Sequence, residues 1–267
     1  MEKSLSGRIA LVTGAAQGIG RVMARSLGLA GARIILSDLR EDAGEETASQ
    51  LRGQGIEARF VVADLSQGEQ ITNMVDRAAQ FFGGLDILVN NARPRLSYEA
   101  FPASMESWDH AMAVLLKAPA LAIAAALPHL ERSAAAAVIN ISSTNAFLIS
   151  QQPVTYHVTK AAILQLTRHL AVELGPKGIR LNAICPGIVD LDDRPQKLTD
   201  DPVNRLVAET VVPLGRAGTA EDIGNLAVFL AGGLAAYITG QAFTIDGGMT
   251  LGDQFAFAKR VALAAKA

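Results

Sequence analysis

The sequence predicts a single α/β domain, in which a doubly wound parallel sheet of about seven strands carries helices on both faces. Three observations predict this fold class. Short apolar, β-branched runs recur along the chain, longer stretches with helical periodicity separate them, and most of the runs are continuous rather than alternating. Continuous apolar runs are typical of strands buried on both faces. Strands and helices that alternate in this way indicate right-handed βαβ crossovers.

The predicted elements follow one another without a linker or an internal repeat. We expect strands at 8–13, 33–37, 59–63, 85–90, 136–142, 179–184 and 242–245. We expect helices near 18–30, 41–53, 67–82, 104–130, 154–175 and 220–232. Residues 1–250 therefore form the predicted domain. The polar region 187–213 follows the carboxyl end of a strand, where ligands bind to such sheets, and is a candidate substrate lid.

The last residues, 251–267, form a predicted carboxyl-terminal extension. Its apolar side chains could share one side, which we expect to pack on a neighbouring subunit; a frayed end is the alternative. These side chains are Phe255, Phe257, Val261 and Leu263.

Composition excludes several classes of protein. A chain of 267 residues can bury a large core. A net charge of −2 without a basic run argues against nucleic-acid binding. The single cysteine, Cys185, cannot form an internal disulfide, and the start of the chain lacks the apolar region of a signal peptide.

The apolar segment 111–130 is interrupted by Lys117 and Pro119, so we interpret it as a buried or interface helix rather than a membrane span. We expect a cytoplasmic protein without a membrane partner.

A glycine-rich turn, "TGAAQGIG" at 13–20, follows the first predicted strand and opens the first helix. Glycines there let the backbone approach a pyrophosphate, whose charge the helix N–H groups attract. The second strand ends at Asp38, whose carboxylate can accept hydrogen bonds from ribose hydroxyls and would repel a 2′-phosphate. This favours NAD over NADP, although Arg40 and Arg21 could reach a phosphate. The other interpretation of Asp38 is a helix cap. The expected cofactor residues of the turn are Gly14, Gln17, Gly18, Ile19 and Gly20.

The stretch "STNAFLISQQPVTYHVTK" at 143–160 contains the candidate catalytic residues. Tyr156 and Lys160 lie one turn apart on one face of a predicted helix. A nearby ammonium favours the phenolate, so Tyr156 can exchange a proton at working pH. Ser143, just ahead, can steady a substrate oxygen on which negative charge develops. A nicotinamide at this edge would then exchange hydride with the carbon that bears that oxygen.

Together these features resemble the short-chain dehydrogenase/reductase family over nearly the whole chain. The matching pieces are "TGAAQGIG", Asp38, "ADLS", "LVNNA", "NISS", "YHVTK", "NAICPG", "PLGRAGTAEDI" and "ITGQAFTIDGG". The resemblance implies a Rossmann-like sheet, a nicotinamide cofactor, a tetrameric assembly and interconversion of alcohol and carbonyl. It also implies that Ser143, Tyr156 and Lys160 are catalytic, that Tyr156 and Lys160 contact the cofactor, and that Lys160 holds the nicotinamide ribose. Further cofactor residues implied by motif position are Asp64, Leu65, Asn91, Pro186, Gly187 and Val189.

Three positions depart from the family pattern. Aligned on Trp108, Leu115 stands where the family has an asparagine that helps hold a water of the proton relay. A leucine side chain cannot hold water, so we expect activity to survive with another proton route. Leu191 stands where a threonine commonly contacts the carboxamide. Arg93 replaces a glycine in "NNAG".

Arg93 and Arg95 follow the fourth strand, at the active edge of the sheet. Arginine forks suit carboxylate, sulfonate or phosphate, so we expect an anionic or polyhydroxylated substrate, such as a sugar acid. The alternative is that one arginine pairs with an acid such as Asp193, or faces water. Asn145 is a further candidate substrate residue. The regions that should shape the substrate site are 93–101, 144–152 and 188–212.

The sequence therefore predicts an NAD-dependent enzyme that acts on a secondary alcohol or its ketone, as a homotetramer or homodimer. One alternative is an NADPH-dependent carbonyl or 3-oxoacyl reductase. The other is a nucleotide-sensing protein that keeps the fold but not the chemistry. We expect no metal site, because the four histidines lack ligand spacing with carboxylates or cysteines. We expect a structural role for Cys185, and we expect His157 to be packed or exposed rather than catalytic.

Overall fold

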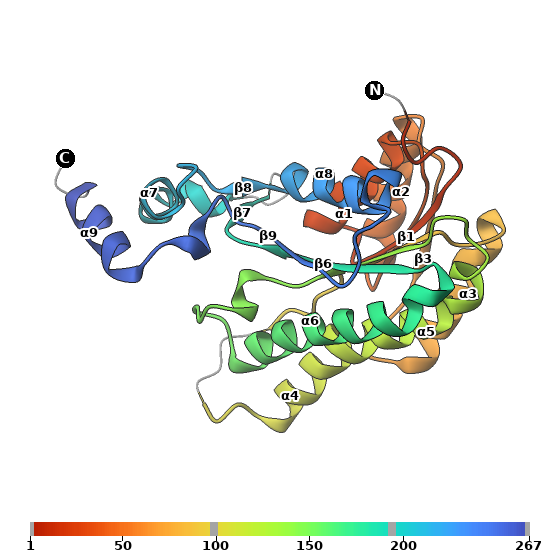
Figure 1. The fold of residues 1–267 in the computed structure, drawn as a ribbon, viewed down its shortest axis with the longest axis horizontal. Helices are drawn as coiled ribbons and strands as arrows, with labels where there is room; N and C mark the ends of the chain where they lie inside the picture. Colours follow the sequence, from red (N-terminus) through yellow and green to blue (C-terminus); the bar gives the residue numbers. More distant parts are fainter. Residues whose placement is uncertain (1–2, 97–100, 192–195, 265–267) are drawn as a thin grey trace.

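A seven-stranded sheet in which every strand pair is parallel forms the centre of the molecule (Figure 1). The computed structural model describes residues 3–96, 101–191 and 196–264. The strands are β1 (Ile9–Thr13), β2 (Arg33–Asp38), β3 (Ala58–Val62), β4 (Ile87–Asn90), β5 (Ala137–Ile141), β6 (Arg180–Pro186) and β9 (Ala242–Ile245). All seven predicted strands are confirmed, with small shifts at their ends.

The order of the strands, β3-β2-β1-β4-β5-β6-β9, reverses direction between β1 and β4. The chain leaves β3 at one edge and returns to the middle of the sheet as β4. Loops that leave the carboxyl ends of β1 and β4 therefore diverge, and a crevice opens between them. The fold thus places a ligand site at this point.

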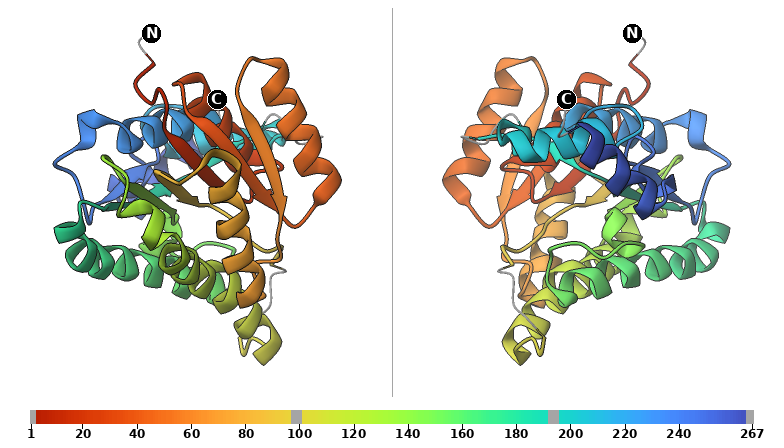
Figure 2. Two further views of the ribbon diagram at one scale, coloured as in Figure 1. Left: turned by 90° about the vertical axis from the view of Figure 1, so that its right-hand side faces the viewer. Right: turned by 90° about the vertical axis from the view of Figure 1, so that its left-hand side faces the viewer.

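Helices cover both faces of the sheet (Figure 2). Helices α1 (Gly18–Leu29), α2 (Glu41–Gly53) and α8 (Ala220–Ala231) lie on one face. Helices α3 (Gly68–Phe82), α5 (Ala118–Leu130) and α6 (Val154–Leu174) lie on the other, and α4 (Met105–Met112) extends from that side. The predicted helix 104–130 consists of α4, a π-helical segment at Ala113–Lys117, and α5.

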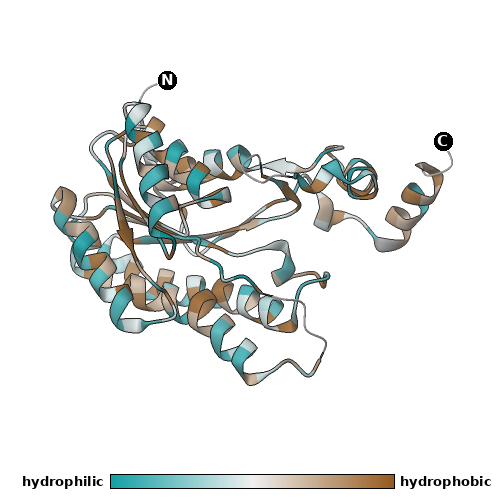
Figure 3. Ribbon diagram, turned by 180° about the vertical axis from the view of Figure 1, so that it is seen from behind, coloured by the Kyte–Doolittle hydropathy of each residue, from teal (hydrophilic) through white to brown (hydrophobic). Residues whose placement is uncertain are grey.

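Two hydrophobic cores, one on each face, explain the continuous apolar runs. In β1, Ala10 and Val12 pack into the core beside α1 and α8, whereas Ile9 and Leu11 pack into the core beside α3 and α5. Successive side chains of a strand point to opposite faces, so both sets must be apolar. Figure 3 shows the central strands coloured as hydrophobic.

The segment 105–130 is, among the described residues, the only helical run long and apolar enough to cross a membrane by length and composition. In the fold its α5 part packs against α3 and buries Ala122, Ile123, Ala126 and Leu130 in the second core. The segment thus serves as a core helix, as its sequence predicts.

Two α-helices and two strands in the described part of the chain were not predicted. β7 (Val189–Asp190) and β8 (Gly218–Thr219) form a small separate pair, and α7 (Pro202–Val211) lies within the predicted lid region. The last helix, α9 (Gln254–Ala264), packs against α7 at one end of the molecule (Figure 1). Phe255 in α9 is 80% exposed. Packing of this helix on a neighbouring subunit stays a prediction.

Candidate active site

The predicted cofactor and catalytic residues gather at the carboxyl edge of the sheet. Gly14, Asp38 and Asn91 lie at the ends of β1, β2 and β4. Ser143 follows β5, and Tyr156 and Lys160 lie in the first two turns of α6. Because the strands are parallel, all of these ends face the same side of the sheet.

The glycine-rich turn is packed so closely that two of its glycines have no room for a side chain. Gly14 has a φ of +63°, and a Cβ there would lie 2.6 Å from the Cα of Ala92. A Cβ on Gly20 would lie 2.2 Å from the carbonyl oxygen of Gly14. The side-chain amide of Asn91 donates to the carbonyls of Thr13 and Gly14 at 2.9 and 3.1 Å. Asn91 therefore fixes the turn, a role that motif position alone does not reveal.

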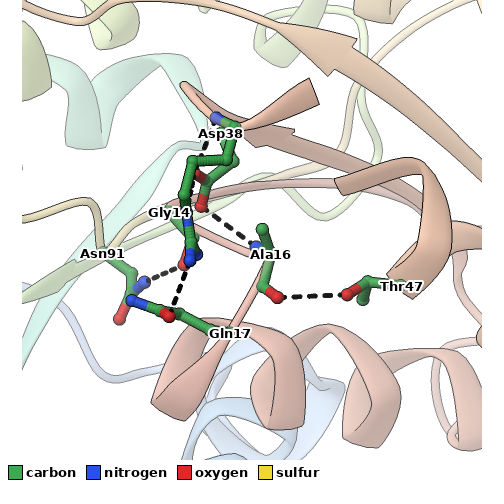
Figure 4. Close-up of polar contacts among 7 residues, drawn as sticks. Gly14, Ala16, Gln17, Asp38, Thr47 and Asn91 are labelled. Atoms are coloured by element: carbon green, nitrogen blue, oxygen red, sulfur yellow. Dashed lines mark hydrogen bonds and ion pairs between the residues drawn. The ribbon is translucent and has the colours of Figure 1, made fainter. Parts of the chain in front are cut away.

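The N-terminus of α1 fits a cofactor pyrophosphate. Its first turn contains no acidic residue, and the side chain of Gln17, the N-cap residue, makes no capping hydrogen bond. Gln17 instead accepts a hydrogen bond from Arg40 at 2.8 Å (Figure 4). The positive end of the helix dipole thus has no side-chain carboxylate in its first turn, as anion binding requires.

Asp38 is held at the end of β2 by backbone donors. One carboxylate oxygen accepts from the amide of Ala16 at 3.1 Å, and the other accepts from the amide of Arg40 at 3.1 Å (Figure 4). The Nε of Arg40 lies 3.4 Å from the second oxygen. Helix α2 begins at Glu41 with Arg40 as its N-cap, so Asp38 does not cap it. The carboxylate stands between the first two strand ends, where the adenosine ribose is expected.

Asp64 and Leu65 follow β3, next to Asp38. The amide of Ala63 donates to the carbonyl of Asp38 at 3.1 Å, which ties these two strand ends together. The Asp64 carboxylate accepts from the amide of Ser66 at 2.9 Å and so shapes the turn into α3. Both residues are only half-buried, which leaves them able to border an adenine ring.

Lys160 is buried against the ring of Tyr156. Its Nζ lies 5.6 Å from the ring centroid and donates to the carbonyl of Ile141 at 2.6 Å. Lys160 is 4% exposed, and burial, followed by the charge of Arg93, lowers the pKa of its amine to about 7. Among the described residues, the Tyr156 hydroxyl has no hydrogen-bond partner, so it is available to a substrate.

Ser143 begins a hydrogen-bond chain that ends at His157. Its hydroxyl oxygen accepts from the amide of Asn145 at 3.1 Å, and the Asn145 side chain donates to the hydroxyl of Ser150 at 2.9 Å. The amide of Ser150 donates to Nε2 of His157 at 3.0 Å. The other ring nitrogen of His157 lies 3.0 Å from the carbonyl of Pro153. This chain ties the loop after β5 to the start of α6.

His157 is therefore packed inside the protein, which is one of the two positions that the sequence allows, and its hydrogen bonds to the loop were not predicted. It is buried, and the two ring contacts require a neutral imidazole with its proton on Nδ1. In the sequence, Ser150 and His157 lie seven residues apart with Pro153 between them. This spacing is the sequence feature that could have indicated the contact.

Two departures from the family pattern lie directly against Tyr156. Leu115 is 2% exposed and packs in a small cluster with Ala111, Tyr156 and Leu96. Leu115 therefore places an apolar side chain beside the phenol ring, and its equivalence to the family asparagine stays a prediction. The guanidinium carbon of Arg93 lies 5.6 Å from the centroid of the Tyr156 ring. Asp193, the suggested partner of an arginine, lies outside the described residues.

The carboxyl end of β6 completes the edge. Gly187 follows Pro186, and a Cβ there would lie 2.6 Å from the Cβ of Asp246, so only glycine fits. Val189 lies in β7. A methyl group of Leu191 lies close to Gly18: a Cβ added at Gly18 would be 3.5 Å from it. Leu191 thus lies over the glycine-rich turn and borders the space for the cofactor.

Cys185 is fully buried beneath this edge, and burial raises the pKa of its thiol to about 11. The thiol is therefore protonated at neutral pH and is a poor nucleophile, in agreement with the predicted structural role. Within the described part of the chain, no three His, Cys, Asp or Glu side chains gather as metal ligands would.

The chain matches known proteins over most of its length. A family model described as enoyl-(acyl carrier protein) reductase matches residues 14–250. The chain is 34% identical to 3beta-hydroxysteroid dehydrogenase 1 of Eggerthella lenta, over 96% of this chain and 99% of the relative. A short-chain type dehydrogenase/reductase from Mycobacterium marinum is 31% identical and has a TM-score of 0.83, over 94% of this chain and 98% of that chain. Blue fluorescent protein from a metagenomic library, solved in complex with NADPH, is 31% identical and has a TM-score of 0.82, over 92% of this chain and 99% of that chain.

The buried amine makes stability depend on pH. Lys160 has a pKa of about 7 in the fold against an ordinary value of 10.5, so the unfolded chain binds more protons between these values. Below pH 7 the amine is charged in both states, and the full cost of burying the charge destabilises the fold. As pH rises from 7 toward 10.5, the folded protein releases this proton and the cost is lost. We expect the unfolding free energy of the cofactor-free protein, relative to that of Lys160→Met, to rise by ~1–2 kcal/mol between about pH 7 and pH 8.5.

Urea titrations at the two pH values measure this change. The pH range ends at 8.5, below the ordinary thiol pKa of 9.0. Above pH 9.0 the raised pKa of Cys185 makes the folded state less stable as pH rises, which opposes the effect of Lys160. A difference between wild type and Lys160→Met that is constant over the range would contradict a desolvated amine.

Proposed function

Because the chain belongs to the short-chain dehydrogenase/reductase family, we propose that it interconverts a secondary alcohol and a ketone with NAD as its cofactor. The contact of Lys160 with Tyr156 carries this proposal, since it places a titratable amine 5.6 Å from the centroid of a phenol ring. The glycine-rich turn and α1 N-terminus fit the cofactor pyrophosphate, as described above. A bound nicotinamide supplies the hydride donor or acceptor.

The chain's own residues supply the proton chemistry. In the oxidative direction, the Tyr156 phenolate accepts the proton of the substrate hydroxyl, and the Lys160 charge stabilises the phenolate beforehand. In the reductive direction, Tyr156 returns the proton to the carbonyl oxygen. The oxygen of Ser143 already accepts from Asn145, so its own hydrogen can point to the substrate oxygen and stabilise negative charge there.

The proposed preference for NAD follows from Asp38. Its carboxylate is only 10% exposed and is fixed at the end of β2 by two backbone amides. A 2′-phosphate at that position would meet this negative charge at close range. A ribose hydroxyl could instead donate to it. Oxidation is the proposed direction, because NAD-dependent enzymes of this kind more often oxidise.

An NADPH-dependent carbonyl reductase is the second candidate, and one observation favours it. The Arg40 side chain is 47% exposed and lies beside Asp38, where it could turn to a phosphate. One structural relative also holds NADPH. A nucleotide sensor remains the alternative of another class, for which the Tyr156, Lys160 and Ser143 arrangement has no use.

As substrate we propose a polyol, a sugar acid or another anionic hydroxy compound. The support is the arginine at 93, which lies against the ring of Tyr156. A screen of polyols, sugar acids, hydroxy acids and cyclic alcohols that follows the absorbance of the reduced cofactor identifies the class.

Replacing Tyr156 with Phe separates an enzyme from a sensor. We expect Tyr156→Phe to lower turnover by about 10²- to 10⁴-fold, because the proton donor and acceptor is lost while the ring stays. Cofactor affinity, measured by the fluorescence of bound NADH, should stay unchanged. Turnover equal to that of wild type would rule out Tyr156 as the acid and base.

Cofactor choice is tested by Asp38→Ala. Wild type should bind NADH more tightly than NADPH. The variant should shift the ratio of the two Kd values toward NADPH by about tenfold or more, corresponding to ~1.4 kcal/mol, because a repelling charge is removed. Glu46→Ala, which removes an exposed carboxylate from the middle of α2, is the control and should leave the ratio unchanged. Tighter binding of NADPH to wild type would favour the reductase candidate.

A further inference from the structure

Two cations lie against the same phenol ring. The guanidinium carbon of Arg93 and the Nζ of Lys160 are each 5.6 Å from the centroid of the Tyr156 ring. Contacts of this length are within the range of cation–π attraction. Lys160 approaches from the protein interior, where it is 4% exposed, whereas Arg93 is exposed and reaches the ring from the loop after β4.

The charge of this pair is not balanced within the described part of the chain. No described carboxylate forms an ion pair with Arg93 or with Lys160. The two cations instead repel each other, as the effect of Arg93 on the pKa of Lys160 shows. Two neighbouring cations without a carboxylate partner attract an anion, since an anion offsets their repulsion.

We propose that Arg93 binds a carboxylate of the substrate, and that the substrate is therefore a hydroxy acid or its oxo acid. This inference rests on the proposed hydride-transfer function. Because Arg93 touches the ring that carries the proton-transferring hydroxyl, the carboxylate and the reacting carbon are separated by only a few bonds. The class is thus that of 2- or 3-hydroxy acids rather than long-chain acids with a distant carboxylate.

The chemistry of arginine suits this role. Its planar guanidinium can hold a carboxylate through two parallel hydrogen bonds, so it fixes orientation as well as charge. The guanidinium carbon lies 5.6 Å from the centroid of the Tyr156 ring, and Arg93 donates no hydrogen bond to any described residue, so its donors are available to a ligand. Arg95 stands two residues further on, but both the ring contact and the charge effect on Lys160 belong to Arg93.

Kinetics with matched probes test the proposal. The probes are lactate and β-hydroxybutyrate, each compared with its neutral amide, in wild type, Arg93→Met, Arg93→Lys and Arg95→Met. We expect Arg93→Met to lower kcat/KM for the two acids by about 10- to 100-fold relative to the amides. Arg93→Lys should restore part of this preference, since charge remains without the fork. Arg95→Met should change acids and amides to the same extent.

Two further measurements do not need turnover. In titration calorimetry, butyrate should bind wild type more tightly than butyramide does, and Arg93→Met should lose this difference. Removal of Arg93 should also raise the pKa of Lys160, because a repelling cation is lost. NADH affinity should stay unchanged, since the proposed ligand of Arg93 is the substrate.

The outcomes distinguish this proposal from the function on which it rests. Equal losses on acids and amides in Arg93→Met, an equal affinity of wild type for butyrate and butyramide, or a loss confined to NADH affinity would each overturn the role of Arg93. Those results would leave hydride transfer intact. Full turnover in Tyr156→Phe would instead overturn the function itself.

Discussion

The burial of one lysine amine against one phenol ring is the constraint on which the candidate site depends. Lys160 gives up its hydration, and the hydrogen bond to the Ile141 carbonyl replaces only part of it. The fold therefore stabilises the charged amine poorly and leaves it titrating near neutral pH. A hydroxyl from Ser142 donates to the backbone carbonyl of Lys160 at 2.7 Å and ties this turn of α6 to β5. The position of the amine is thus set by the contact between a strand end and a helix start.

The parallel sheet brings the other groups to the same place. Its strand ends carry the glycine-rich turn, the carboxylate of Asp38 and the hydroxyl of Ser143 to one edge, although they are far apart in the sequence. A buried polar network keeps the middle of this edge in register. The Asn90 amide donates to Asn140 at 2.9 Å, and Asn140 donates to Thr167 of α6 at 2.9 Å. Fully satisfied networks of this kind fix a single arrangement of the elements that they join.

The sequence predicts the regular part of this structure, because its pattern is local. Strand β1 is apolar from Ile9 to Val12 because each face meets its own core. The spacing of Tyr156 and Lys160 follows from helix geometry alone. The secondary structure of the lid region was not predicted correctly. Its polar, proline-containing sequence indicates an irregular segment, although α7 is a short amphipathic helix. The two-residue strand β7 depends on its partner β8. The contact of Arg93 with the Tyr156 ring and the hydrogen bonds of His157 depend on the paths of two loops, which periodicity does not encode.

A direct titration of Lys160 tests the central claim, which is that the fold desolvates this amine beside Tyr156. The side-chain nitrogens of the lysines can be followed by NMR in the cofactor-free protein, with Lys160→Met to assign the signal. One lysine should titrate with a pKa of about 7 and should be missing from the variant. If every lysine in the wild-type protein titrates near the ordinary value of 10.5, the amine is solvated, which contradicts its burial against the Tyr156 ring.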